Sequence, residues 1–279
     1  MYAIQLLSIE RRKRNAARHL DPKIKIMNAL LSKSLLAGAA LSLTGLASAN
    51  ASEPKPTVVL VHGAFADASG WSKVILRLEK AGYPTIGVQN SLRSLPDDIA
   101  TTKRVIDSVQ GPVVLVGHSY GGAVITGAAV DSPNVKSLVY IAAFAPEVGE
   151  KINELHGQLG EAPLGAALVA DSAGFVSIDR TKFHDVFAAD VTADEAVTMA
   201  ATQKPFAVAA FSGSLDNIAW KTLPSWYLVA TEDKAILPEL QHFMAKRIGA
   251  KSIVEVKASH VPFVSQPDVV AQLIEDAAR

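Results

Sequence analysis

From residue 57 onward, short apolar runs alternate with segments that have helical spacing. Runs such as 57–63, 112–117 and 225–230 are apolar along most of their length rather than at every second position. Between them, segments such as 69–82 and 95–111 place apolar residues on one helical face. Strands that are apolar on both sides are typical of a parallel sheet covered by helices. The sequence therefore predicts an α/β fold with a mostly parallel central sheet and helices on both faces.

The alternation stops after Pro146 and resumes at Ser225. Residues 147–222 hold helical stretches, such as 192–203, and no convincing buried strand. A long insertion inside a compact domain usually has a functional role, such as that of a lid. We expect one α/β domain over residues 52–279, with a helical cap insertion at about 147–222.

Residues 1–51 have the three parts of a secretory signal peptide. Lys33 precedes a short apolar run over 35–47, and small residues follow, giving cleavage motifs that end at Ala49 and Ala51. The run is shorter than the roughly 20 residues that a membrane-spanning helix needs. We expect export to the periplasm or the medium after cleavage near Ala49 or Ala51, and no membrane span in the mature protein.

Basic residues gather at the start of the chain. Residues 1–51 hold eight of the 27 Lys and Arg and two of the 27 Asp and Glu, so the remainder has a net charge of −6. Arg11–Arg14 lies within residues 1–26, which are either an extension upstream of a true start at Met27 or a long basic n-region. The acidic remainder has no basic stripe for nucleic acid. The absence of cysteine fits an exported protein that does not depend on disulfides.

Residues 113–124, VVLVGHSYGGAV, place Ser119 between a strand and a helix in the pattern Gly-x-Ser-x-Gly. This pattern is the nucleophile elbow, a sharp turn that presents the serine hydroxyl above the sheet edge at a helix N-terminus. Close packing on both sides of the turn explains Gly117 and Gly121, and Gly122 lets the helix approach the strand. The helix dipole favours negative charge that develops beside Ser119.

A catalytic serine needs a base, and the base needs an orienting acid, in the chain order Ser, acid, His for this topology. His260 is the candidate base because it lies in the loop between the last strand and the last helix. Asp233, just past the run 225–230, is the candidate acid. Glu232 is a rival that the sequence separates only weakly from Asp233, and Glu147 is a more distant alternative.

The tetrahedral intermediate of such a reaction needs two backbone N–H donors, which form an oxyanion hole. Tyr120, the residue after the nucleophile, supplies one donor. The loop after the first strand supplies the other, because Gly63 lets that loop turn toward the serine. Ala64 is the preferred second donor, and Phe65 is the next choice.

Four segments together, VLVHGAFADASGW, LVGHSYGG, YLVATEDKAI and ASHVPFVSQP, resemble the α/β-hydrolase-fold family. They are similar to small bacterial serine esterases and to the plant methyl-esterase and hydroxynitrile-lyase branch. The resemblance covers essentially all of residues 57–279. It implies a serine hydrolase that cleaves a small to medium carboxylic ester through an acyl-enzyme, with Ser119, His260 and Asp233 as its triad.

Individual residues argue for or against the other reactions that proteins of this fold catalyse. Dehalogenases and epoxide hydrolases carry an aspartate nucleophile, so Ser119 argues against both. Hydroxynitrile lyases of this branch carry a threonine at the position of Gly63 and a lysine at that of Val261, so cyanohydrin cleavage is not expected. A carbon–carbon hydrolase or lyase on the same triad, and a non-catalytic small-molecule receptor, stay open as alternatives.

Aromatic residues of the insertion and of the loops near the serine are candidates for substrate contacts. They would suit an uncharged acyl or alcohol group, and the candidate substrate-binding residues are Phe65, Trp71, Phe144, His184 and Trp220. The sequence has no dinucleotide fingerprint and no metal-ligand cluster, so no cofactor and no metal is expected. The expected partner is a small-molecule ester rather than nucleic acid, and the oligomeric state is left open.

Overall fold

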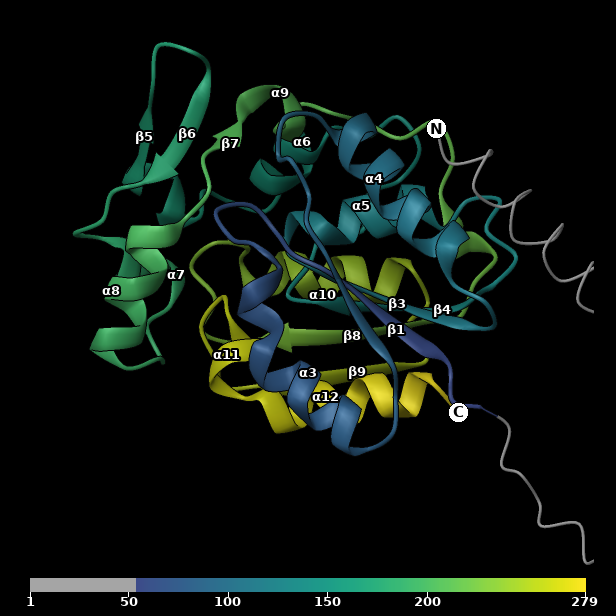
Figure 1. The fold of residues 1–279 in the computed structure, drawn as a ribbon. Coiled ribbons are helices and arrows are strands. Elements are labelled where there is room, and N and C mark those ends of the chain that lie inside the picture. The colour runs from purple at the N-terminus through teal and green to yellow at the C-terminus, as the bar shows by residue number, and fades with distance from the viewer. Residues whose placement is uncertain (1–53) are drawn as a thin grey trace, which may run out of the picture. The chain divides into compact units, whose positions relative to one another are not determined.

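Six parallel strands form the central sheet in a computed structural model that describes residues 54–279. The sheet order is β2-β1-β3-β4-β8-β9, and each neighbouring pair is parallel (Figure 1). The predicted α/β fold is therefore confirmed. The predicted signal peptide, its cleavage sites and Met27 lie outside the described residues. The strands are β1 Thr57–Val61, β2 Thr85–Val88, β3 Val113–His118, β4 Val135–Ile141, β8 Ser225–Ala230 and β9 Ser252–Val256.

The register of the central strands brings their carboxyl ends to one edge of the sheet. Val58 pairs with Val114, and Gly117 pairs with both Val61 and Tyr140. All six residues of β3 are buried, which explains why this strand is apolar on both faces. Loops that follow these strands therefore meet at one edge, where ligands of open α/β sheets bind.

Helices cover both faces of the sheet (Figure 1). One face carries α3 Ser72–Lys80, α11 Pro262–Ser265 and α12 Pro267–Ala277, and the other carries α4 Leu95–Ser108, α5 Tyr120–Ala128 and α10 Pro238–Arg247. Ser94 starts α4, because its hydroxyl accepts the N–H of Asp97. Eight of the nine residues of α5 are buried, as expected of a helix that is apolar all round. Among residues 54–279, no helix is both long enough and apolar enough to cross a membrane.

The insertion between β4 and β8 contains strands as well as helices. Besides the helices that the sequence predicts for this insertion, β5, β6 and β7 form a three-stranded antiparallel sheet that the sequence analysis did not identify. These strands have two to four residues, and β5 is exposed, so they give no apolar run in the sequence. The elements are α6 Ile152–Gly157, the 3-10 helix η2 Pro163–Ala167, β5 Leu168–Ala170, β6 Phe175–Ile178, α7 Phe183–Phe187, α8 Ala193–Thr202, β7 Phe206–Ala207, α9 Val208–Phe211 and the 3-10 helix η3 Ala219–Lys221.

The insertion leaves and re-enters the domain at neighbouring points. Val148 and Leu215 form an isolated parallel bridge between the outgoing and returning segments. Nearby, Glu150 accepts a hydrogen bond of 3.0 Å from Arg247 on α10. The cap elements β5, β6, α7 and α8 lie together at one end of the sheet (Figure 1).

Candidate active site

Ser119 lies on a strained turn between β3 and α5. Its φ of 53° and ψ of −124° fall in a region that non-glycine residues rarely adopt. Two backbone bonds to the Ser119 carbonyl stabilise the turn, from Gly122 N–H and Phe144 N–H, each at 3.0 Å. The Ser119 N–H in turn donates to Ile141 on β4. The elbow is thus attached to the next strand of the sheet, as the Gly-x-Ser-x-Gly pattern predicts.

Close backbone contacts account for the glycines around the serine. A Cβ at Gly117 would lie 2.5 Å from the Gly121 carbonyl oxygen, and a Cβ at Gly121 would lie 2.6 Å from the Val61 carbonyl oxygen. A Cβ at Gly122 would overlap the Phe144 carbonyl oxygen. Since these neighbours are backbone atoms, they cannot rotate away, and only glycine fits at the three positions.

His260 and Asp233 form a buried pair beside the serine. The His260 Nδ1 donates to Asp233 Oδ2 at 2.7 Å, and both side chains are almost fully shielded from solvent. Glu232, the rival acid, is exposed and instead forms a 3.5 Å ion pair with Lys257. The structure therefore brings His260 together with Asp233 rather than with Glu232.

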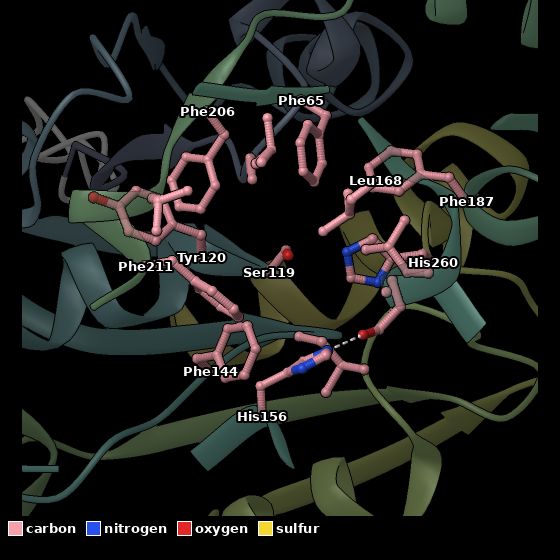
Figure 2. Close-up of a pocket in the computed structure, with 17 residues that line it drawn as sticks. Phe65, Ser119, Tyr120, Phe144, His156, Leu168, Phe187, Phe206, Phe211 and His260 are labelled. Carbon is pink, nitrogen blue, oxygen red and sulfur yellow. Dashed lines mark hydrogen bonds between the residues drawn. The ribbon is translucent and has the colours of Figure 1, made fainter. Parts of the chain in front are cut away.

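The His260 ring faces the space into which Ser119 points (Figure 2). Within residues 54–279 no hydrogen bond joins the serine hydroxyl to the ring. Such bonds are often long in unliganded enzymes and tighten when the substrate binds. The three residues can therefore serve as nucleophile, base and orienting acid.

A buried histidine in the β1 loop fixes the peptide that carries the Ala64 N–H. His62 Nε2 accepts the Asn90 N–H at 3.0 Å, so its proton is on Nδ1, which donates to the Gly63 carbonyl at 2.9 Å. That carbonyl belongs to the same rigid peptide unit as the Ala64 N–H. Neither the Ala64 nor the Tyr120 N–H donates to another group of the described chain, so both are free to bind an oxyanion.

The Gly63 position also depends on the serine itself. A Cβ at Gly63 would lie 2.7 Å from the Ser119 Cβ. The next residue but one, Phe65, has a φ of 59°, so the loop turns sharply at this point. The loop thus passes directly over the nucleophile, where it must be for its N–H groups to act.

Tyr120 is fixed on its hydroxyl side by a buried carboxylate. Its hydroxyl donates to Asp98 Oδ2 at 3.0 Å, and Asp98 Oδ1 accepts the N–H groups of Ser91 and Leu92. Burial, followed by the charge of Asp98, raises the pKa of the Tyr120 hydroxyl well above its ordinary value. The hydroxyl therefore stays protonated. Sequence reasoning missed Asp98, because an acidic residue in the first turn of a helix is explained by the helix dipole alone.

His118, the residue before the nucleophile, is a second buried histidine that the sequence left without a role. Its Nε2 donates to the His260 carbonyl at 2.8 Å. Its ring packs against Trp71, Phe263 and the His260 ring. Burial lowers the pKa of His118 well below 6.5, and the charge of His260 lowers it further. A neutral His118 thus supports the backbone of the histidine loop.

An apolar cavity of about 130 Å³ opens above Ser119. An apolar cavity of about this size can hold a single aromatic ring. Figure 2 shows the rings of the wall arranged around the serine. No charged side chain lines it, and its wall consists of Ala64, Phe65, Ser119, Tyr120, Phe144, His156, Leu164, Gly165, Leu168, Val176, Phe187, Phe206, Val208, Phe211, Ala235, Ile236 and His260.

Of the five candidate substrate-binding residues, the cavity wall includes Phe65 and Phe144 and leaves out the other three. Trp71 is fully buried behind the site, 4.6 Å from the Phe263 ring. Trp220 donates its indole N–H to the Pro146 carbonyl at 3.0 Å. The ring of His184 hydrogen-bonds to the Val191 carbonyl within the cap. The structure does not bring these three side chains to the cavity wall, because each packs against or hydrogen-bonds to other parts of the protein.

The cap contributes wall residues that the sequence did not identify individually. His156 on α6 lies between Phe144 and Phe211, and its Nε2 donates to the Ala235 carbonyl at 2.7 Å. Phe187 on α7 lies against the His260 ring, with centroids 5.0 Å apart. Neither residue has a sequence signal, because aromatic residues of a helix look the same whether they pack inside the cap or face a cavity.

Comparison with known proteins identifies the family of this chain. The family model described as "Alpha/beta hydrolase family" matches residues 58–273. The chain belongs to the alpha/beta hydrolase family. The "Alpha/beta hydrolase nvfD" of Aspergillus novofumigatus is 31% identical over 249 residues, which cover 80% of this chain and 97% of that protein. Esterases are also among the relatives of this family member.

"Methylesterase 7" of Arabidopsis thaliana is 26% identical over 249 residues, covering 79% of this chain and 95% of that protein. The "Pyrethroid hydrolase" of Sphingobium wenxiniae is 26% identical over 254 residues, which cover 79% of this chain and 87% of that protein. The crystal structure of polyneuridine aldehyde esterase superposes with a TM-score of 0.70 at 19% identity, covering 81% of this chain and 100% of that chain. The similarity to plant methylesterases that the motifs indicate is thereby confirmed.

Metal-ligating side chains do not gather in the described part of the chain. No group of three or more His, Asp or Glu residues within 54–279 has the arrangement to hold a metal ion. The polar groups at the cavity are those of the serine, the two histidines and the tyrosine. The site as described offers acid–base and nucleophilic groups.

Proposed function

We propose that the protein is a serine hydrolase that cleaves small to medium, uncharged carboxylic esters through an acyl-enzyme. One observation carries the proposal: Ser119 on its strained turn and the His260–Asp233 pair open into the same apolar cavity. A nucleophile, a base and an orienting acid at one cavity are what acyl transfer to water requires.

In the first step His260 takes the proton of Ser119 as the serine oxygen attacks the ester carbonyl carbon. The carbonyl electrons move to the oxygen, which the N–H groups of Ala64 and Tyr120 stabilise. A donor of this kind typically contributes about 2.7–4 kcal/mol to the transition state. Asp233 stabilises the imidazolium, and His260 then gives its proton to the departing alcohol.

In the second step water replaces the alcohol. His260 takes a proton from the water molecule, whose oxygen attacks the acyl carbon bound to Ser119. The second tetrahedral intermediate uses the same two N–H groups. Its collapse releases the carboxylic acid and returns the proton to the serine oxygen.

The cavity supports an uncharged substrate. A carboxylate or ammonium group placed there would lose its hydration without gaining a charged partner from the wall. Relatives described as a methylesterase and a pyrethroid hydrolase also support ester cleavage. The aromatic wall, with Phe206 5.9 Å from Phe65, would favour a flat or branched apolar group.

A series of p-nitrophenyl esters of increasing acyl length tests the proposal. We expect wild-type protein to hydrolyse the shorter esters and the Ser119→Ala variant to lose nearly all turnover. Ser132→Ala is a matched control, because Ser132 is a buried serine that bonds to the Ala128 carbonyl and takes no part in the site. Circular dichroism spectra establish that all three proteins are folded.

Three results would contradict the ester hydrolase. Hydrolysis that persists in Ser119→Ala would remove the nucleophile from the mechanism. Folded wild-type protein with no ester hydrolysis, yet covalently labelled at Ser119 by a fluorophosphonate, would favour a carbon–carbon hydrolase or lyase on the same triad. Folded wild-type protein that neither hydrolyses the esters nor is labelled at Ser119 would favour a small-molecule receptor.

We also propose that the chain is exported, on the strength of the leader pattern in residues 1–51. Fractionation of a Gram-negative host that expresses the full chain tests this. We expect the protein in the periplasm or the medium with a new N-terminus after Ala49 or Ala51. Cytoplasmic protein that keeps its leader would contradict the proposal.

A further inference from the structure

A buried glutamine on α10 lies beside the carboxylate of the proposed triad. Gln241 is fully shielded from solvent. Its Nε2 donates to Asp233 Oδ2 at 2.7 Å. The same oxygen accepts the His260 Nδ1–H, also at 2.7 Å. One carboxylate oxygen therefore accepts hydrogen bonds from both the histidine and the glutamine.

The backbone around Gln241 decides which way its amide points. The Oε1 atom accepts the Ala230 N–H at 3.0 Å, and Nε2 donates its other hydrogen to the Ile236 carbonyl at 2.8 Å. A flipped amide would set its NH₂ against the Ala230 N–H and its oxygen against Asp233 and the Ile236 carbonyl. The donor must therefore face Asp233.

The other carboxylate oxygen is bound separately. Asp233 Oδ1 accepts the N–H groups of Ala235 at 2.7 Å and Ile236 at 3.0 Å. These bonds anchor one oxygen to the loop but leave the tilt of the carboxylate plane to the partners of Oδ2. His260 cannot set that tilt alone, because it is the group that has to be oriented.

We propose that Gln241 is a positioning residue of the triad, which holds the Asp233 carboxylate so that Oδ2 faces the His260 ring. Gln241 does not itself line the cavity. Apart from its bonds to the Ala230 and Ile236 backbone it contacts Asp233, so it acts through that carboxylate. Its effect on turnover rests on the proposed function, whereas its effect on the Asp233–His260 hydrogen bond does not.

Gln241→Met tests the proposal, because methionine keeps nearly the same volume and removes the donor. Outer-shell partners that orient metal ligands typically change activity about 10–100-fold when they are replaced, and we expect the same order for a partner that orients a triad carboxylate. We expect kcat for p-nitrophenyl butyrate to fall by about that factor with KM unchanged. The matched control is Gln203→Met in the cap. Gln203 makes the same kind of backbone bonds, to Ile178 and Ala200, without touching a triad residue.

A double-mutant cycle separates positioning from general destabilisation. In an Asp233→Ala background we expect Gln241→Met to have no further effect on kcat, because the group it acts through is gone. An equal loss of kcat in both backgrounds would overturn the proposal, as would full kcat in Gln241→Met. If the methionine variant does not fold, Gln241→Leu removes the donor with a branched apolar side chain. The same cycle then applies, and full kcat would again overturn the proposal.

A measurement without substrate keeps this inference distinct from the proposed function. The His260 Nδ1 proton is expected as a downfield NMR resonance in wild-type protein. We expect that resonance to move or broaden in Gln241→Met and to stay unchanged in Gln203→Met. An unchanged resonance in Gln241→Met would overturn the positioning role. Lack of ester hydrolysis in wild-type protein, with the resonance behaving as expected, would overturn only the proposed function.

Discussion

The turn around the nucleophile and the cap above it differ in how tightly their glycines are enclosed. Gly117, Gly121 and Gly122 each face backbone atoms at distances that no Cβ tolerates. In the cap, a Cβ at Gly157 or Gly165 would meet no atom of residues 54–279 within 4 Å apart from those of its own local backbone. The elbow is thus fixed by backbone contact, and each of its glycines is required. The cap is held by side-chain packing, which other sequences can achieve.

The two regions also differ in what they bring to the cavity. The sheet edge supplies the polar groups, namely Ser119, His260 and, behind it, Asp233. The cap supplies mainly apolar side chains, among them Phe187 and Phe206. On the proposed function, the sheet edge would carry out the reaction, and the cap would set the size and shape of the substrate.

The largest effect is expected at the triad acid. Asp233→Asn should reduce kcat for a p-nitrophenyl ester by about 10⁴-fold, because an amide stabilises the wrong tautomer of the histidine. The exposed neighbour provides the matched control, and Glu232→Gln should leave kcat unchanged. Steady-state kinetics of both variants decide the matter. A large loss in Glu232→Gln together with an active Asp233→Asn would reverse the assignment of the acid.

The next largest effect is expected on the free energy of unfolding, when a glycine of the elbow and a glycine of the cap are each replaced by alanine. In Gly122→Ala the new methyl group would overlap the Phe144 carbonyl oxygen and lie 2.8 Å from the Ala143 Cβ. We expect the free energy of unfolding to fall by about 3 kcal/mol, as in other overpacked cores. Gly157, the last residue of α6, has no positive φ and has open space around it. Gly157→Ala should therefore raise that free energy by about 0.4–1 kcal/mol, because alanine restricts the unfolded chain. Urea unfolding measures both, and equal effects would abolish the distinction between the regions.

Removing an aromatic ring of the cap should change the preference for acyl chain length and have little effect on the reaction itself. Phe211 lines the cavity and lies 6.1 Å from the Phe144 ring. Phe211→Ala should favour a longer acyl chain over a short one by about tenfold in kcat/KM, since a methylene in an apolar pocket is worth about 1–3 kcal/mol. Phe243→Ala, on the outer surface of α10, is the control. An unchanged chain-length profile for Phe211→Ala would mean that the cap does not set selectivity.

The smallest effect concerns the buried histidines of the sheet edge. Burial lowers the pKa of His62 below 6.5 and that of His118 well below it, so both stay neutral in the folded protein. The unfolded chain binds these protons below about pH 6.5, so folding stability is present above that pH and is lost as the pH falls toward the folded pKa values. Each proton contributes a slope of up to about 1.4 kcal/mol per pH unit.

His118→Gln should flatten this dependence by about one proton, because glutamine does not titrate. Urea unfolding between pH 7 and pH 5 measures the slope for wild-type protein and for the variant. Parallel slopes in the two proteins would show that His118 takes up its proton equally in the folded and unfolded chain.

Most of the fold could be predicted from the sequence, because its strands are buried on both faces. β3 and β8 are continuous, mostly buried runs, and several such runs alternating with helical segments are typical of a parallel sheet. The cap strands could not be found in this way. β5 is wholly exposed and β7 has two residues, so neither carries a periodic pattern.

The candidate site likewise contains residues that the sequence could predict and residues that it could not. Ser119 and Ala64 follow from short motifs, whose spacing is set by the turn that they form. Trp71 and Trp220 were expected at the cavity, yet each packs elsewhere. An aromatic residue carries no signal for the direction in which it points.

By itself the sequence determined the parallel sheet, the elbow at Ser119 and the order in which acid and base follow, because local backbone geometry dictates those residues. It left Asp233 and Glu232 nearly equivalent, and it gave no role to Gln241. Only the tertiary structure separates them, because it places Asp233 against both His260 and Gln241 and leaves Glu232 exposed. A carboxylate becomes an orienting acid through the groups that pack around it, and those groups come from α10 and the last loop, distant in sequence.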